Sequence, residues 1–313
     1  MNTSTITLDP PHPVLSPPAA PERPHYHRIA RTQANYRWWR PLITAVVAVA
    51  SYAAMMLLLF ATVAIVVLIN PQIETSVDLL SLDTDMYNPY HFMGTMVTLI
   101  PMIPAVMLGV AAGRRPVGTL LSVAGRLRWR VLGRSLAICL GVYLAGQLFF
   151  LALAWFEGEP VAPTWHPYSW WLILGALLIV PFQAAAEEFA FRALPMQVFG
   201  AWLRNPFWGI LLPLPLFVVA HDYNAAGLLG VAAFALAAGV LVWRTGGIEA
   251  AIALHVVNNS LVFAFGAVGW LDLNFPESTI LDTLASTAIL AVCTVLILWV
   301  ERKARRSRSA KSR

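Results

Sequence analysis

Long apolar segments separated by short polar loops dominate the pattern along this chain. Residues 41–69 contain no Asp, Glu, Lys, Arg or His, and about 20 apolar residues in a helix are enough to cross a bilayer. Pro213 and Pro215 interrupt one of the later apolar segments. The same length test predicts seven further spans near 92–112, 135–156, 169–199, 206–221, 225–243, 247–267 and 280–300. The pattern therefore predicts an all-α polytopic membrane bundle of about eight transmembrane helices.

Composition supports a membrane location. The 313 residues are 58% hydrophobic and 12% charged, with a mean hydropathy of +0.67, whereas soluble domains carry about 25% charged residues. This balance excludes an ordinary soluble protein, and equally a disordered, collagen-like or disulfide-rich secreted one. The two cysteines, Cys139 and Cys293, lie in apolar runs and suit a packing role. The net charge of +5 does not indicate nucleic-acid binding, because the basic residues cluster beside the apolar spans.

The two ends of the chain differ from the apolar middle. Seven prolines between residues 10 and 24 oppose helix formation. Residues 1–35 are therefore predicted to form a disordered, Pro-rich cytoplasmic tail, and the start of the chain lacks the apolar region of a signal peptide. Residues 301–313 are predicted to form a basic cytoplasmic tail, because residues after Val300 include seven Lys or Arg.

The charges of the loops predict the orientation in the membrane. Loop 113–134 carries six arginines and no acidic residue, whereas loop 70–91 carries four acidic residues and no Lys or Arg. Loops 157–168 and 268–279 contain acidic residues and no Lys or Arg. Because cytoplasmic loops are enriched in Lys and Arg, both termini are predicted to lie in the cytoplasm.

Polar residues are concentrated in the fourth, fifth and seventh predicted spans. A charged group at the bilayer centre costs about 2.5–3.5 kcal/mol even on a lenient scale, so three helices that tolerate such groups indicate an internal polar site. The distances of these groups from the span ends allow them to meet within the membrane, nearer its cytoplasmic half. The polar residues concerned are Glu187, Glu188, Arg192, His221, Asp222, Glu249, His255, Asn258 and Asn259.

Glu187 and Glu188 are the strongest candidates for chemistry in the fourth span. Glu188 precedes Arg192 by four residues, which is the favourable order for an ion pair along a helix. This pairing leaves Glu187 on another face as a free carboxylate, and a carboxylate in an apolar setting suits a general base. The competing interpretation is a structural ion pair near a helix end.

The fifth and seventh spans contribute histidines at helical spacing. His221 follows Phe217 by four residues, and Asn259 follows His255 by four residues. Residues four apart share one face of a helix, so His255 and Asn259 present two hydrogen-bond donors that can hold an oxyanion. The competing interpretation is polar contact between helices, which such residues commonly supply. Asn258 is assigned a structural role.

Taken together, these motifs resemble a known family. Glu-Glu-x-x-x-Arg at 187–192, Phe-x-x-x-His at 217–221 and His-x-x-x-Asn at 255–259 follow one another on three separate predicted spans. This set resembles the CAAX-protease and bacteriocin-processing family of intramembrane glutamic endopeptidases, which are related to the type II CAAX prenyl endopeptidase. The run Arg-Thr-Gly-Gly-Ile at 244–248 is also similar to the family.

The resemblance also divides the chain. The catalytic transmembrane core is expected at 135–267. Residues 36–134 then hold the N-terminal spans and the basic cytoplasmic loop, and residues 268–300 hold the last span.

The resemblance implies a role for each matching residue. It implies that Glu187 activates water and that His221 assists it. His255 and Asn259 are implied to stabilise the oxyanion, with Glu188 and Arg192 in support. The expected function is hydrolysis of a peptide bond in a membrane-associated peptide or protein, by a multi-pass protein of the bacterial cell membrane.

Other interpretations stay open. The resemblance favours hydrolysis without a cofactor, but one Glu and two His can also form a zinc site of the His₂Glu kind, although the sequence has no His-Glu-x-x-His motif. The same fold can serve as a non-catalytic membrane scaffold or bacteriocin-immunity protein. A polar site at mid-membrane depth also suits a secondary transporter. The sequence does not indicate the substrate, its prenylation or the oligomeric state.

Overall fold

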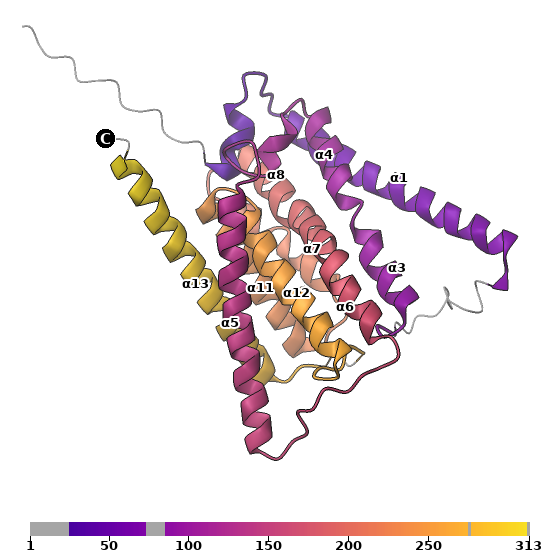
Figure 1. Ribbon diagram of the computed structural model, residues 1–313. Coiled ribbons are helices and arrows are strands. Elements are labelled where there is room, and N and C mark those ends of the chain that lie inside the picture. Colours follow the sequence, from indigo (N-terminus) through magenta and orange to yellow (C-terminus); the bar gives the residue numbers. More distant parts are fainter. Residues whose placement is uncertain (1–24, 73–84, 275–276, 312–313) are drawn as a thin grey trace, which may run out of the picture.

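Helices make up the regular structure of this protein. The computed structural model describes residues 25–72, 85–274 and 277–311 (Figure 1). Within these ranges the one β-pairing is an isolated antiparallel bridge between Ser122 and Gly247. The helices are α1 (Arg40–Ile69), α3 (Pro89–Leu99), α4 (Met102–Ala112), α5 (Trp129–Phe156), α6 (Ser169–Leu178), α7 (Val180–Glu188), α8 (Leu194–Trp202), α9 (Phe207–Leu211), α10 (Leu214–Val219), α11 (Ala225–Thr245), α12 (Glu249–Ala267) and α13 (Ile280–Lys311), with short turns η1 (Tyr26–Thr32), η2 (Val117–Leu120) and η3 (Phe189–Ala193). The all-α fold class predicted from the sequence is confirmed.

The lengths of these helices bear on the predicted number of spans. Six segments of the described chain are long and apolar enough to cross a membrane. A seventh is added if α6 and the helical segment Val180–Trp202, which are bent by 42° relative to each other, form one span. The predicted fifth span corresponds to the shorter apolar segment Phe207–Val219. The predicted count of eight is therefore not confirmed. Pro213 and Pro215 lie where α9 ends and α10 begins, and proline removes a backbone donor from a helix.

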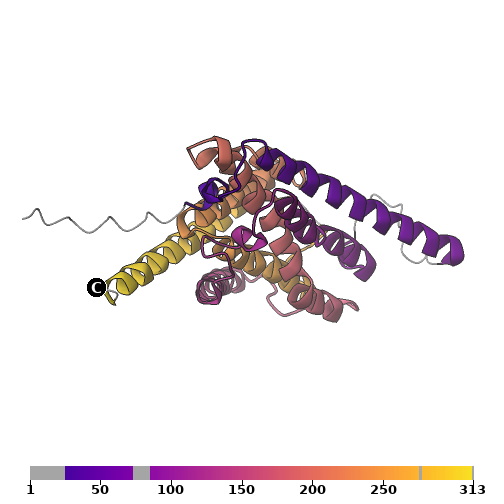
Figure 2. The same cartoon turned by 90° about the horizontal axis from the view of Figure 1, so that it is seen from above.

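The long apolar helices make this chain a multi-pass membrane protein, and α12 lies inside its bundle. α12 contacts α5, α6, α7 and α11, and Figure 1 shows it between α5 and α13 on one side and α3 and α4 on the other. Ala250, Ala251 and Ala253 on α12 are fully buried. Small side chains let neighbouring helices approach closely in a membrane, so α12 can present its polar residues directly to α7. By contrast, α1 packs on α4 at the periphery, as the view in Figure 2 shows.

A tight turn fixes the start of α12. Gly246 ends α11 with φ 77°, a left-handed conformation that favours glycine. At Gly247 a Cβ atom would lie 2.7 Å from the carbonyl oxygen of Leu121, so the backbones approach too closely for a side chain. Glu249, which is fully buried, then forms an ion pair at 2.6 Å with Arg128, whose side chain is partly exposed. This pair ties the start of α12 to the segment before α5 and explains Glu249 as a structural carboxylate.

The N-terminal segment corrects a second prediction. Residues 1–35 were predicted to be disordered, but Tyr26–Thr32 form the turn η1, which packs against α8. Tyr26 and Ile29 are buried, and the Arg28 guanidinium donates to the carbonyl of Gly200. The prediction was wrong for residues 25–35, because the prolines end at Pro24 and an apolar face follows them. The rest of the predicted tail, residues 1–24, lies outside the described residues.

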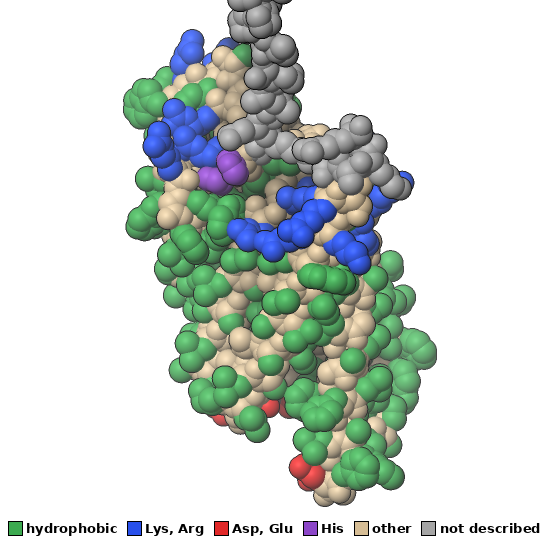
Figure 3. All heavy atoms as spheres, turned by 90° about the vertical axis from the view of Figure 1, so that its left-hand side faces the viewer, with side chains coloured by type: hydrophobic (Ala, Val, Ile, Leu, Met, Phe, Trp, Pro, Cys, Tyr) green, Lys and Arg blue, Asp and Glu red, His purple; other side chains and the backbone are tan. Residues whose placement is uncertain are grey.

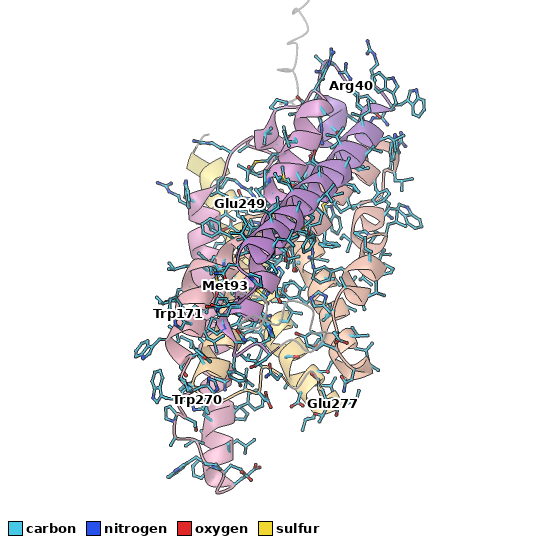
Figure 4. All side chains as sticks on the ribbon, turned by 90° about the vertical axis from the view of Figure 1, so that its right-hand side faces the viewer. Arg40, Met93, Trp171, Glu249, Trp270 and Glu277 are labelled. Carbon is cyan, nitrogen blue, oxygen red and sulfur yellow. The ribbon has the colours of Figure 1, made fainter. Side chains whose placement is uncertain are left out.

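Charge is divided between the two ends of the bundle. Figure 3 shows Lys and Arg side chains gathered at one end of the visible face and Asp and Glu at the other. Figure 4 places Arg40 near the first end and Trp270 and Glu277 near the opposite end. This division matches the alternation of loop charges on which the orientation prediction depends.

Candidate active site

A buried carboxylate pair lies at the end of α7. Glu187 is 7% exposed and Glu188 is fully buried. A π-helical turn, η3, follows Glu188 and carries Arg192; such turns are frequent at functional sites. The Arg192 Nη1 atom lies 3.2 Å from Glu188 Oε1, so the ion pair expected from the spacing is present.

Arg192 is held by aromatic rings as well as by charge. Its guanidinium carbon lies 4.0 Å from the centre of the Phe217 ring and 5.5 Å from that of Phe234. Neither Nη atom has a hydrogen-bond partner among the described residues. Attraction to the ring faces therefore adds to the ion pair, and Arg192 connects α7 to α10 and α11.

His255 on α12 contacts both glutamates. Its Nδ1 atom lies 2.7 Å from Glu188 Oε1, and its Nε2 atom lies 3.6 Å from Glu187 Oε2. With its proton on Nδ1, the imidazole donates a hydrogen bond to Glu188. This bond fixes the orientation of the ring and directs Nε2 toward Glu187. Glu187 Oε2 is buried and has no hydrogen-bond partner within the described part of the chain. Glu188 Oε2 is likewise buried without a hydrogen-bond partner among these residues.

The other oxygen of Glu187 is held by a residue that sequence reasoning missed. Gln183 donates from Nε2 to Glu187 Oε1 at 2.7 Å, and it accepts from Asn259 Nδ2 at 3.3 Å. Gln183 is buried and lies one helical turn before Glu187 on α7. The spacing of four residues was the available signal, because residues four apart share a helix face.

Asn259 belongs to a longer polar chain across the helices. Its side-chain oxygen accepts from Asn258 Nδ2 at 2.9 Å, and Tyr143 on α5 donates to Asn258 Oδ1 at 3.0 Å. Asn259 therefore reaches Glu187 through Gln183. Asn258 supports this chain, in line with its expected structural role.

His221 joins the cluster through an aromatic ring. It follows the end of α10, and its Nδ1 atom lies 2.8 Å from the carbonyl oxygen of Phe217. The ring centres of His221 and Phe217 are 4.8 Å apart. The Phe217 ring also contacts the guanidinium of Arg192. The structure thus brings Glu187, Glu188, Arg192 and His255 into direct contact, and it connects His221 to them through Phe217.

The glutamates and histidines of this cluster can be compared with the ligands of a metal centre. Among the described residues, no group of three or more His, Cys, Asp or Glu side chains is arranged to hold a metal ion. The nearest approach to such a set is Glu187 with His255, whose other ring nitrogen is bonded to Glu188. These contacts fit a hydrogen-bonded cluster.

The comparisons with known proteins point to the same region. Residues 168–261 match the family model described as type II CAAX prenyl endopeptidase Rce1-like. This part of the chain is similar to the CAAX proteases. The Rce1-like region runs from the start of α6 into α12 and contains all six candidate residues. The resemblance suggested by the motifs is thereby confirmed, and the match points to a protease.

One curated relative covers most of the chain. The uncharacterized protein YyaK of Bacillus subtilis (strain 168) is 26% identical over 256 residues, which cover 74% of this chain and 79% of the relative. No solved structure matches the chain. The Rce1-like match therefore carries the functional argument.

Proposed function

We propose that this chain is an intramembrane endopeptidase that hydrolyses a peptide bond of a membrane-associated peptide or protein, in processing of the CAAX type. The observation that carries the proposal is the unsatisfied Glu187 Oε2 atom, buried and 3.6 Å from His255 Nε2. A buried carboxylate oxygen without a partner is costly, and a water molecule that it can deprotonate supplies one. The Rce1-like match supports the same reaction.

In this proposal Glu187 acts as the general base. Its Oε2 atom accepts a proton from water, whose oxygen then forms a bond to the carbonyl carbon of the substrate. The proton later passes to the departing amine as the peptide C–N bond breaks. Gln183 holds the other oxygen of Glu187 at 2.7 Å, which keeps Oε2 aimed at the reaction site.

The surrounding residues complete the proposed mechanism. Glu188 orients His255 through Nδ1, and His255 donates to the oxyanion of the tetrahedral intermediate from Nε2 in the form that carries a proton on both ring nitrogens. Asn259 donates to the same oxyanion from Nδ2. His221, anchored through Nδ1 at the carbonyl of Phe217, assists Glu187 with proton transfer. Arg192 neutralises the charge of Glu188. No metal ion is required by this scheme.

The proposed environment follows from the loop charges and the relative. We place both termini in the cytoplasm, which requires an even number of crossings, so the bent pair of α6 with α7 and α8 and the shorter segment Phe207–Val219 must either both cross the membrane or both not cross it. The similarity to a Bacillus subtilis protein supports a bacterial cell membrane. The partners are the lipid bilayer and the membrane-associated substrate.

The experiment uses the full chain purified in detergent and a library of membrane peptides analysed by mass spectrometry. Glu187→Gln keeps the side-chain shape but loses the proton acceptor, so turnover should fall by about 10²–10⁴-fold. The matched control is Glu159→Gln, which changes an exposed glutamate in the loop after α5. Equal cleavage patterns for wild type and Glu187→Gln would contradict the proposal and favour a scaffold or immunity protein.

A chelation experiment distinguishes metal-free hydrolysis from zinc-dependent hydrolysis. Activity should survive dialysis against a strong chelator, since in the proposed mechanism Glu187 activates the water and side-chain hydrogen bonds hold the oxyanion. Activity that disappears with the chelator and returns with one equivalent of zinc would overturn the metal-free scheme and assign the histidines as ligands.

A further inference from the structure

A second feature lies at the end of the bundle where arginines gather. A cavity of about 1290 Å³ opens between the start of α5, the end of α11 and the last turns of α13. Seven of the residues that line it are arginines, and one is acidic. Figure 3 shows Lys and Arg side chains around a hollow at this end. Glu187 and the other proposed catalytic residues are not among the lining residues, so this cavity is separate from the proposed active site.

The positive charge of this cavity is only partly neutralised. Its acidic residue, Glu301, is paired with Arg134 at 2.6 Å. Arg126, Arg130 and Arg302 are exposed and form no ion pair with any residue that the structure describes. Three cationic side chains from two separate segments therefore face one volume, and each offers several N–H donors suited to phosphate oxygens.

The aromatic lining of the cavity indicates a position near the depth of the lipid headgroups. Trp129, Trp243 and Trp299 line it, and tryptophan is enriched where a membrane meets water. Along α13 the lining changes from the apolar Val295 and Leu298 to arginines in the following turns. One wall therefore offers apolar contacts toward the membrane interior and cationic contacts toward the water.

The walls of the cavity are fixed by hydrogen bonds between elements. Arg305 on α13 and Arg128 before α5 both donate to the carbonyl oxygen of Thr245, at 2.5 and 2.9 Å. Three elements thus meet at one carbonyl at the end of α11. In addition, α5 begins at Trp129 without a side-chain cap, so its first N–H groups add partial positive charge.

We propose that this cavity binds the anionic headgroup of a membrane phospholipid. Arg126, Arg130 and Arg302 hold the phosphate, while Val295 and Leu298 contact the acyl chains. The apolar side of the wall favours a lipid over a soluble phosphate or an acidic peptide, because neither of these needs apolar contacts. Basic pockets between transmembrane helices are suited to anionic headgroups.

The test measures lipid binding to the full chain after delipidation in a neutral detergent. Native mass spectrometry gives the affinity for phosphatidylglycerol, with phosphatidylcholine as the neutral lipid and glycerol phosphate as the headgroup without chains. The triple variant Arg126→Gln, Arg130→Gln and Arg302→Gln should bind phosphatidylglycerol about 100-fold more weakly, because each cation near an anionic surface contributes about a factor of five.

A charge-matched control separates a site from general surface charge. Arg37→Gln, Arg114→Gln and Arg204→Gln remove three exposed arginines that do not line the cavity. This variant should bind phosphatidylglycerol as the wild type does. If the cavity triple does not fold, the single variant Arg302→Gln replaces it, with an expected loss of about five-fold.

Three results would overturn the proposal. Equal binding of phosphatidylcholine and phosphatidylglycerol would remove the role of the anionic headgroup. Equal losses in the two triple variants would show diffuse attraction to the surface. Binding of glycerol phosphate as tight as that of the lipid would assign the cavity to a soluble phosphate compound.

Discussion

The ion pair of Glu188 and Arg192 provides a stringent test of how the polar cluster is held. Both side chains are almost completely buried, and the charges are 3.2 Å apart. Glu188→Gln removes the negative charge and leaves Arg192 uncompensated within the membrane-spanning region. Breaking a buried pair from one side costs about 3–5 kcal/mol, so the free energy of unfolding should fall by this amount.

The structure also indicates what should restore stability. The Arg192 guanidinium packs on Phe217 at 4.0 Å, and methionine can fill this place with an apolar side chain. Arg192→Met alone should be about as destabilising as Glu188→Gln, because it leaves the buried negative charge of Glu188 without its arginine partner. The double variant removes both charges, so its loss should be at least about 2 kcal/mol smaller than the sum of the single losses.

The assay is unfolding in detergent for the wild type, the two single variants and the double variant. Peptide cleavage is measured in parallel and should stay low in the double variant, since His255 loses the carboxylate that accepts from Nδ1. Losses that simply add would refute the idea that the pair stabilises the cluster as a unit. A loss below about 1 kcal/mol for Glu188→Gln would refute the buried-charge argument itself.

Three further predictions concern other parts of the molecule. Asn259→Ala should lower turnover by about 10²–10³-fold with little change in substrate binding; a change confined to KM, measured by steady-state kinetics, would contradict this role. Reporter fusions should read as external at residue 162 and internal at residue 120, and a cytoplasmic signal at 162 would reverse the proposed orientation. Burial lowers the pKa of His27, a residue of η1, so the unfolded chain binds a proton more readily and stability should be lost as pH falls below the ordinary value of about 6.5. Melting curves between about pH 7.5 and 5.5 test this, and His27→Gln should show a smaller drop than the wild type.

Much of the helical architecture was predictable, because apolar length is a direct physical requirement of a membrane span. The fifth predicted span shows what this reasoning does not capture. Residues 206–221 are apolar enough to suggest a crossing, but the structure divides them into α9 and α10 near Pro213. Hydropathy measures the cost of transfer into lipid, whereas continuity of a helix depends on backbone donors that proline lacks.

The candidate site was predictable where contacts are local. Glu188 and Arg192 are four residues apart on one segment, and their pairing follows from helix geometry. The contact of Glu188 with His255 depends instead on how α7 and α12 are rotated against each other. The role of Tyr143 is equally distant in sequence, because it reaches Asn258 from α5. Spacing in one segment carries no information about such rotations.

Glu187 and Glu188 are chemically identical, and the residues that contact each of them determine their different roles. Glu188 Oε1 is shared by His255 and Arg192, so this carboxylate is committed to holding the cluster together. Each carboxylate has an Oε2 atom without a hydrogen-bond partner among the described residues, but Glu187 is anchored at its other oxygen by the neutral amide of Gln183 and forms no ion pair with an arginine there. A carboxylate anchored in this way can accept a proton without breaking an arginine ion pair or losing its position. For that reason the base is assigned to Glu187, although the two residues cannot be distinguished by type.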